Sequence, residues 1–338
     1  MKAVYFEKPW EVGIKDIEQR PLTKGEALVE IVSAGICGSD IGAFRGKNNL
    51  VSYPRVIGHE LAGIVREIPA ENPKGLKVGD KVVVDPYLYC GHCYPCSIGR
   101  TNCCNELHVL GVHVDGGMTK TFAHPADMLV KIPEDIDWEL AAMAEPLTIS
   151  LHGLHRLQLT KGEHIAIFGA GPIGMLAAMA ALHYEAVPIM IDVVDERLDF
   201  AKSLGVPHVI NPTKEDQVEK TREYTNGRMA ECVMEASGAN SAIRATLDLV
   251  CHAGRIALTG WPKTETPIPT DLITRKEIDI RGARTSAGEF EESVDLIYNK
   301  KVDVRKLLTK TISIDEAPDT IIDIEKNPGD YMKVVVMM

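Results

Sequence analysis

Short runs of apolar and β-branched residues recur through the first half of the chain, separated by turn residues. Four of these runs predict strands over residues 2–7, 27–33, 61–68 and 81–84. Lys-Pro and Asn-Pro-Lys-Gly turn signals lie among them. This spacing is typical of an all-β barrel or sandwich with long loops.

The pattern changes after about Pro146. An apolar strand is predicted over 165–168, followed by a helix over 172–184, a strand over 188–192 and a helix over 196–204. Further strands are expected at 208–210, 232–234, 255–258 and 277–280, with helical segments between most of them. Such alternation builds a parallel sheet covered by helices on both faces. The segment 332–336 again predicts a strand, which we expect to return to the first domain.

Length and composition narrow the class of protein. A chain of 338 residues exceeds the usual size of a single core, so two domains are expected. Its 45% apolar and 25% charged residues are typical of an ordinary soluble protein. The net charge of −11 argues against nucleic-acid binding. No apolar run approaches the roughly twenty residues of a membrane span, and no signal peptide is recognised, so a cytoplasmic location is expected.

Four cysteines lie within fifteen residues: Cys90, Cys93, Cys96 and Cys104. Thiolates at two-residue spacing converge on one tetrahedral Zn²⁺, and four protein sulfurs leave no open position, which predicts a structural zinc site. Cys103 is an alternative fourth ligand. Disulfides in a secreted domain are disfavoured, because eight cysteines in the chain do not make a disulfide-rich composition. Cys103, Cys232 and Cys251 are then expected to be free thiols.

A glycine-rich segment follows the predicted strand over 165–168 and opens a helix. Its sequence is Gly169-Ala170-Gly171-Pro172-Ile173-Gly174, which has the form G-x-G-x-x-G. This form alone is a weak signal, but its place between strand and helix is that of a dinucleotide fingerprint. Gly169 would allow the tight turn, Gly171 the approach of a pyrophosphate and Gly174 the close packing of helix on strand.

Asp192 ends the next predicted strand, eighteen residues beyond Gly174. A carboxylate there can accept hydrogen bonds from the adenine ribose hydroxyls and would repel a 2′-phosphate, which favours NAD over NADP. An exposed acidic strand end is the alternative interpretation. Arg197 lies a helical turn further on, and we expect it to lie along the adenosine or to serve as a surface charge.

Three other segments offer ligands for a second metal. Cys37 and Ser39 lie in Gly-Ile-Cys-Gly-Ser-Asp, His59 and Glu60 in Gly-His-Glu, and Glu145 precedes Pro146. Cysteine, histidine and carboxylate all bind zinc, and a catalytic zinc keeps a position for water or substrate. Taken singly, Cys37 is more simply a core residue and Glu60 a solvated charge. Mixed ligation of this kind also accepts other divalent ions.

Together these motifs resemble the zinc-dependent medium-chain alcohol dehydrogenases, in the expected order and over nearly the whole chain. Val-Gly-Asp-Lys-Val at 78–82, Asp-Gly-Gly at 115–117 and Glu-Pro-Leu at 145–147 also match. Glu-Pro-Leu and Cys-Gly-Ser-Asp are similar to the branch of sorbitol, idonate and galactonate dehydrogenases. The resemblance implies an α/β protein in which a GroES-like β-barrel domain (1–148, completed by 286–338) receives an inserted Rossmann domain (149–285), with the active site in the cleft.

The resemblance also implies roles for single residues. Cys37 and His59 would bind the catalytic zinc, Glu60 and Glu145 would share the carboxylate role, and Ser39 would begin a proton relay. Which of the two glutamates binds zinc directly stays open. Many relatives have a histidine five residues after the zinc-binding cysteine, and this chain has Gly42 there. The proton is therefore expected to leave through water, the ribose or another side chain.

The expected cofactors are two Zn²⁺ per chain and NAD(H), and the expected substrate is a small-molecule alcohol. Tyr53 and Arg284 are candidate substrate residues on the resemblance, and an arginine can bind a carboxylate in bidentate fashion. A secondary hydroxyl of a sugar acid or polyol is the leading substrate. A threonine-type dehydrogenase, a zinc-free relative that reduces double bonds and a non-catalytic NAD(H) redox sensor are the alternatives. The resemblance further implies a homodimer or homotetramer.

Overall fold

The computed structural model describes all residues from 1 to 338, and the chain forms two compact units. The first comprises Met1–Glu145, Phe290–Lys300 and Val304–Met338, and the second Pro146–Glu289 and Lys301–Asp303. The expected domains had their limits at 148/149 and 285/286, and the chain passes between the units at 145/146 and 289/290. None of the helices is long and apolar enough to cross a membrane.

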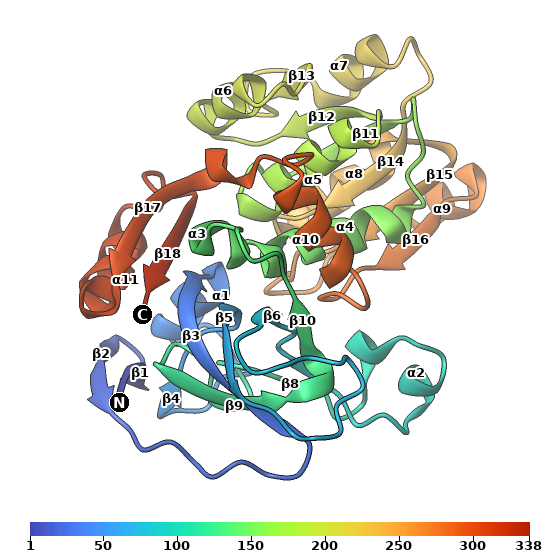
Figure 1. The fold of residues 1–338 in the computed structure, drawn as a ribbon. Coiled ribbons are helices and arrows are strands. Elements are labelled where there is room, and N and C mark those ends of the chain that lie inside the picture. The colour runs from blue at the N-terminus through green and yellow to red at the C-terminus, as the bar shows by residue number, and fades with distance from the viewer. The chain divides into compact units, whose positions relative to one another are not determined.

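The first unit is built mainly of antiparallel strands (Figure 1), arranged in a seven-stranded, a three-stranded and a two-stranded sheet. The strands are β1 (Lys2–Lys8), β2 (Glu11–Asp16), β3 (Glu26–Ile36), β4 (Arg55–Val56), β5 (Glu60–Glu67), β6 (Lys81–Val84), β7 (Tyr87–Leu88), β8 (His108–Val109), β9 (Thr121–Pro125), β10 (Leu129–Lys131), β17 (Leu308–Ser313) and β18 (Lys333–Met337).

Strand β3 is the centre of the large sheet, because it pairs with β5, β9 and β18. Its side chains alternate between buried and half-buried positions, as expected of a strand with one face on a core. The final strand β18 pairs antiparallel with β3, with Val334 opposite Ile36. The predicted return of the chain to the first domain is therefore confirmed, and residues from both chain ends share one core.

Short helices connect these strands. They are α1 (Gly38–Phe44), α2 (Tyr94–Ser97), α3 (Trp138–Ala141), α10 (Phe290–Tyr298), α11 (Ala317–Lys326) and the 3₁₀ turns Thr101–Cys103, Ala126–Met128, Val304–Leu307 and Ile314–Glu316. Helix α4 (Ala144–Leu157) begins in the first unit and continues into the second.

The second unit contains one six-stranded parallel sheet in the order β13-β12-β11-β14-β15-β16. The strands are β11 (His164–Phe168), β12 (Val187–Ile191), β13 (His208–Ile210), β14 (Ala230–Glu235), β15 (Val250–Leu258) and β16 (Asp279–Gly282). This order is that of a dinucleotide-binding Rossmann sheet, whose ligands bind beyond the carboxyl ends of the strands where the order reverses, at β11.

The remaining helices of this unit follow the strands. They are α5 (Pro172–His183), α6 (Asp195–Ser203), α7 (Gln217–Tyr224), α8 (Asn240–Leu249) and α9 (Thr270–Lys276). Helix α5 contacts β11 and β12 and is buried along nearly its whole length. The strand expected over 277–280 begins later, at Asp279, because Glu277 is in the left-handed region (φ 52°) and ends α9.

Candidate metal centres and cofactor site

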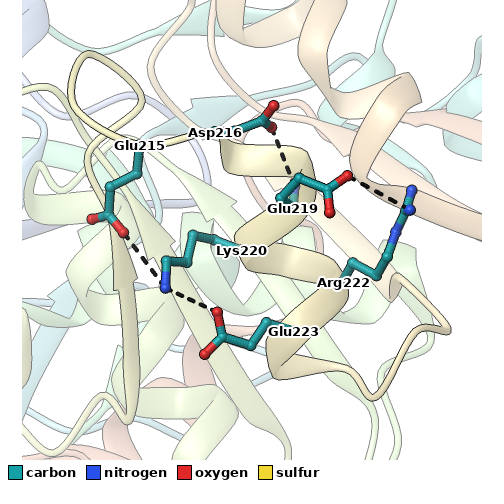
Figure 2. A pocket seen from close by; sticks show the side chains of 6 residues that line it. All are labelled: Glu215, Asp216, Glu219, Lys220, Arg222 and Glu223. Carbon is teal, nitrogen blue, oxygen red and sulfur yellow. Dashed lines mark hydrogen bonds and ion pairs between the residues drawn. The ribbon is translucent and has the colours of Figure 1, made fainter.

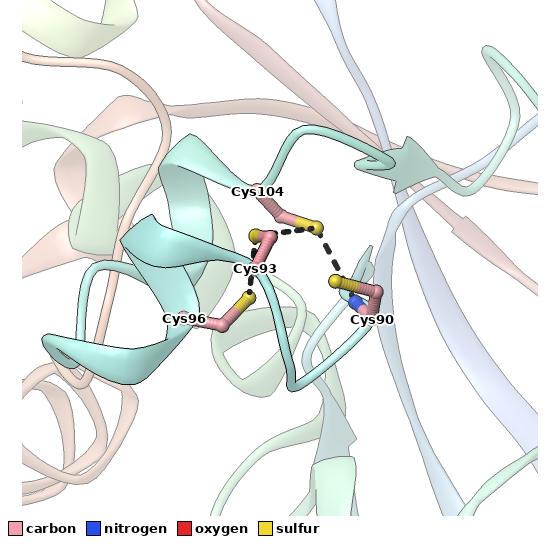
Figure 3. Close-up of side chains that lie close together, drawn as sticks. All are labelled: Cys90, Cys93, Cys96 and Cys104. Carbon is pink, nitrogen blue, oxygen red and sulfur yellow. Dashed lines mark hydrogen bonds between the residues drawn. The ribbon is translucent and has the colours of Figure 1, made fainter.

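The four predicted cysteines converge in one lobe of the first unit (Figure 3), and their sulfur atoms lie within 4.8 Å of one another. The Sγ of Cys93 is 3.4 Å from that of Cys96 and 3.8 Å from that of Cys104. A zinc–thiolate tetrahedron with bonds of about 2.3 Å has sulfur–sulfur edges of about 3.8 Å, so these residues fit a closed Zn²⁺ site. The group contains Cys104, while Cys103 lies in the preceding 3₁₀ turn.

The second predicted metal centre lies where β3 meets β5. Cys37 is the N-cap of α1, immediately after β3, and Glu60 is the first residue of β5. His59 precedes it, after a turn in which Gly58 has φ 102° and an added Cβ would lie 2.8 Å from the Met118 nitrogen. One ligand atom from each of Cys37, His59 and Glu60 lies within 4.8 Å of the others.

This cluster has the features of a cation site that is open on one side. His59 and Glu60 are buried, and the buried atoms His59 Nδ1 and Glu60 Oε2 have no hydrogen-bond partner. Buried polar atoms are normally paired, so two such atoms beside a thiol fit a divalent metal. Cys37 and Ser39 are only half-buried, and Ser39 Oγ lies 3.5 Å from His59 Nε2. The half-buried side leaves room for a further ligand next to a serine hydroxyl.

The backbone of β3 is shaped around the Glu60 carboxylate. Gly35 lies opposite Glu60 in the ladder. A Cβ on Gly35 would lie 1.8 Å from Glu60 Oε2 and 2.9 Å from its carboxyl carbon. Because such contacts are impossible, only glycine at this position lets the carboxylate occupy its place beside Cys37.

Lys333 supplies the positive charge that the sequence interpretation missed. Its ammonium group donates a very short hydrogen bond to Glu60 Oε1 and another, of 3.2 Å, to the Ile36 carbonyl. Lys333 and Glu60 side chains are 3% and 1% exposed, so both charges are desolvated and depend on each other. Burial lowers the pKa of Lys333, but Glu60 and Cys37 outweigh burial and raise it overall.

Glu145 lies in the first turn of α4, and its Oε1 accepts a very short hydrogen bond from the Tyr87 hydroxyl. Both side chains are buried. Burial, together with the charge of Glu60, raises the pKa of Glu145 to about 7. Burial lowers the pKa of His59, but the negative charges of Cys37, Asp40 and Glu145 outweigh it and leave the pKa well above its usual value. The raised pKa of Glu145 shows that its negative form is disfavoured in this buried setting, and a cation bound beside it would relieve that cost.

The glycine-rich segment of the second unit has the predicted geometry. Gly169 follows β11 with φ 97°, and Gly171 is the N-cap of α5, with Pro172 and Ile173 in its first turn. A Cβ on Gly174 would lie 1.9 Å from the Gly169 carbonyl oxygen, so this glycine permits the close packing of helix on strand. A Cβ on Gly171 would meet nothing within 4 Å, which leaves the helix N-terminus accessible to a phosphate.

Beside this turn lies a hollow of about 200 Å³, lined by Phe168, Gly169, Asp192, Pro212, Ser237 and Ala242 among others. The Asp192 carboxylate accepts hydrogen bonds from Ala170 N at 2.7 Å and Val194 N at 2.9 Å. Each carboxylate oxygen has a second lone pair, so Asp192 can hold the turn and still accept a ribose hydroxyl. Arg197 lies half-buried in the first turns of α6.

The two candidate substrate residues lie in different units. The Tyr53 hydroxyl donates to the Ala43 carbonyl, and its ring packs on the core of the first unit. In the second unit, the Arg284 guanidinium lies over the ring of Trp261, 5.9 Å from the centroid. Trp261 is 64% exposed and follows β15, while Arg284 follows β16, so both lie at the carboxyl edge of the sheet.

Sequence reasoning missed Lys333, Tyr87 and Asp40. A lysine opening an otherwise apolar final strand is a signal for Lys333, whereas nothing in the sequence pairs Tyr87 with Glu145.

A further hollow on the second unit is lined only by charged side chains of α7 and the preceding turn (Figure 2). They pair with one another, as in the 2.9 Å contact of Lys220 with Glu223, so we assign no chemistry to this hollow.

Comparison with known proteins agrees with this geometry. Residues 23–134 match the family model of the alcohol dehydrogenase GroES-like domain, and residues 172–299 match that of the zinc-binding dehydrogenase. An uncharacterized zinc-type alcohol dehydrogenase-like protein of Haemophilus influenzae is 53% identical over 99% of this chain and 98% of its own length. L-galactonate-5-dehydrogenase of Escherichia coli is 35% identical over 86% of this chain and 84% of its own.

A solved structure supports the same assignment. The alcohol dehydrogenase rspB from Escherichia coli CFT073, complexed with NADH, has a TM-score of 0.94 and 34% identity, and the match covers 100% of this chain and 99% of that one. The chain therefore belongs to the zinc-dependent medium-chain alcohol dehydrogenases, in the branch that includes polyol and sugar-acid dehydrogenases. It is a zinc-dependent, NAD(H)-linked oxidoreductase acting on alcohols, and the expected fold and cofactors are confirmed.

The buried ion pair gives a first prediction. Replacing Lys333 by Met leaves the Glu60 charge unpaired in the metal-free protein, which should lower its free energy of unfolding by about 3–5 kcal/mol. The loss should shrink in zinc-loaded protein, because Zn²⁺ then neutralises Glu60. Urea unfolding with and without zinc measures the free energy of unfolding in both metal states. The exposed Lys310→Met is the control, and an equal loss in both metal states would contradict the assignment of Glu60 as a ligand.

Asp192 gives a second prediction. Asp192→Ala should reduce the preference for NAD over NADP by roughly tenfold, since a ribose contact is lost and the repulsion of a 2′-phosphate is relieved. The dissociation constants of NADH and NADPH, measured by fluorescence titration, check this. Asp199→Ala, on the exposed side of α6, should leave the ratio unchanged. A constant ratio in Asp192→Ala would show that the ribose does not contact this carboxylate.

Proposed function

We propose that this enzyme oxidises a secondary hydroxyl of a sugar acid or polyol to a ketone and transfers the hydride to NAD⁺. The observation that carries the proposal is the cluster of Cys37, His59 and Glu60, with unpaired buried atoms and the Ser39 hydroxyl on its half-buried side. A thiol, an imidazole and one carboxylate leave a fourth tetrahedral position for the substrate oxygen. The Rossmann unit binds the hydride acceptor.

A Zn²⁺ ion held here would supply Lewis-acid chemistry, polarising the substrate hydroxyl and stabilising the negative charge that develops on its oxygen. Cys37, His59 and Glu60 would be its protein ligands. We favour Glu60 over Glu145 as the direct ligand, because Glu60 belongs to the compact ligand group and Glu145 is held by Tyr87. Glu145 would accept a hydrogen bond from the water or hydroxyl beside the metal.

Ser39 is the proposed first proton acceptor. Its oxygen lies 3.5 Å from His59 Nε2, so a hydroxyl bound beside His59 would also be within reach of Ser39. The neighbouring Gly42 carries no imidazole to continue the relay. The proton would therefore pass from Ser39 to the cofactor ribose or to water.

A carboxylate on the substrate would suit Arg284, whose guanidinium is oriented by its contact with Trp261. The galactonate and sorbitol dehydrogenases among the relatives act on a sugar acid and a polyol, as their names state, which supports the same choice. Tyr53 is the second proposed substrate residue.

A threonine-type specificity is the second candidate function, since an L-threonine 3-dehydrogenase of Shewanella woodyi is also similar, at 32% identity. A homodimer or homotetramer is proposed from the family resemblance.

The test is NADH formation, followed by absorbance, with aldonates, polyols and threonine as substrates and with the zinc content known. Cys37→Ser and His59→Ala should each lower turnover by about 10²–10³-fold or more, because each removes part of the group that stabilises developing charge. Both variants should still bind NADH, since the dinucleotide site is in the other unit. Cys251→Ser, with its thiol outside both metal groups, is the control and should keep its turnover.

Two results would contradict the proposal. Retained turnover in Cys37→Ser and His59→Ala would exclude the metal assignment. No turnover of any substrate class by wild-type protein carrying two zinc ions and binding NADH would favour the non-catalytic sensor.

A further inference from the structure

A two-stranded sheet at the base of the four-cysteine lobe joins the lobe to the rest of the first unit. Strand β7 ends two residues before Cys90, and β8 begins four residues after Cys104. The two strands pair antiparallel, with Tyr87 opposite Val109 and Leu88 opposite His108. The chain therefore enters and leaves the lobe through one short ladder, and Tyr87 is part of it.

Hydrogen bonds fix the backbone on both sides of Tyr87. Tyr87 N donates to Asp85 Oδ1 at 3.1 Å, and Leu110 N donates to the Pro86 carbonyl at 3.1 Å. Asp85 is itself anchored, because its amide donates to the Met128 carbonyl at 2.9 Å and its carbonyl is 2.9 Å from His124 Nε2. The backbone around Tyr87 is therefore held on one side by Leu110, in the chain that leaves the lobe, and on the other by Met128 and His124.

Tyr87 is also the residue of this ladder whose side chain contacts Glu145. Its side chain is buried and its hydroxyl donates to Glu145 Oε1. We propose that Tyr87 is a positioning residue through which the four-cysteine lobe holds the Glu145 carboxylate beside the catalytic metal. The lobe then does more than stabilise its own loop, because it sets the orientation of a carboxylate outside it.

This inference rests on the catalytic metal site of the proposed function, and it predicts a metal-binding defect that needs no substrate to measure. Outer carboxylates and their hydrogen-bond partners usually change metal affinity by 10–100-fold when they are removed. Removing only the Tyr87 hydroxyl should therefore weaken binding of the catalytic zinc and leave the lobe zinc in place, since no cysteine is touched.

The first experiment compares Tyr87→Phe with Tyr89→Phe. Tyr89 follows on the same segment but is 40% exposed, so it is a matched control. Zinc content per chain is measured across chelator-buffered zinc concentrations. Tyr87→Phe should weaken binding of the catalytic zinc by about tenfold or more, and Tyr89→Phe should weaken it by less than about twofold. If Tyr87→Phe binds the catalytic zinc as tightly as the wild type, the inference is wrong. Loss of the lobe zinc in this variant would also overturn it, because Tyr87 would then have a structural role in the lobe.

The second experiment tests the link to the lobe. Cys93→Ser removes one lobe ligand and should weaken the remaining zinc site by a similar factor, whereas the double variant with Tyr87→Phe should be little weaker than either alone. If the two fold-changes multiply instead, Tyr87 does not carry the effect and the inference is wrong. A wild-type protein that binds only the lobe zinc would contradict the proposed function, which distinguishes the two failures.

Discussion

A cluster of ionisable side chains, most of them buried, is the constraint on which the first unit depends. Cys37, Asp40, Glu60 and Glu145 lie together, and Lys333 and His59 are the positive or protonatable groups that face them. Burial raises the pKa of Asp40, and the pKa values of Glu145 and His59 are raised as well. Bringing these groups together without a cation costs stability, so a divalent metal completes the arrangement that the fold has assembled.

The path of the chain follows from this requirement. Cys37 lies immediately after β3, Glu60 begins β5 and Lys333 begins β18, the last strand of the chain. The ladder between β3 and β18 places the ammonium group of Lys333 against Glu60 Oε1. Gly35 in β3 makes the space for the same carboxylate. A single sheet therefore positions the Glu60 carboxylate, its counter-charge Lys333 and the space that Gly35 leaves for it.

The sequence alone was sufficient to predict the groups of residues that belong to short motifs. The four cysteines, the glycine-rich turn and the Cys37, His59 and Glu60 motifs each lie within a short stretch, and the structure brings each group together as expected. The partners of these groups were not predictable in the same way. Lys333 is 273 residues from Glu60, and Tyr87 is 58 residues from Glu145, so only the strand register and the packing bring them into contact.

The start of one strand and the presence of one helix could not be predicted from the sequence. The sequence contained no signal that Glu277 would take a left-handed conformation, which delays β16 to Asp279. The helix α4, which carries Glu145 near its start, was not predicted from the sequence. Proline in the first turn of a helix is well tolerated, and here it follows the Glu145 carboxylate at the start of α4.

The most direct test of this account is a crystal structure of the zinc-loaded protein with anomalous diffraction at the zinc edge. We expect two anomalous peaks per chain, one among the sulfur atoms of the four-cysteine lobe and one between Cys37 Sγ, His59 and Glu60 Oε2. A single peak in the lobe, with Glu60 Oε2 hydrogen-bonded to another protein group, would contradict the claim that the buried charge cluster is a metal site.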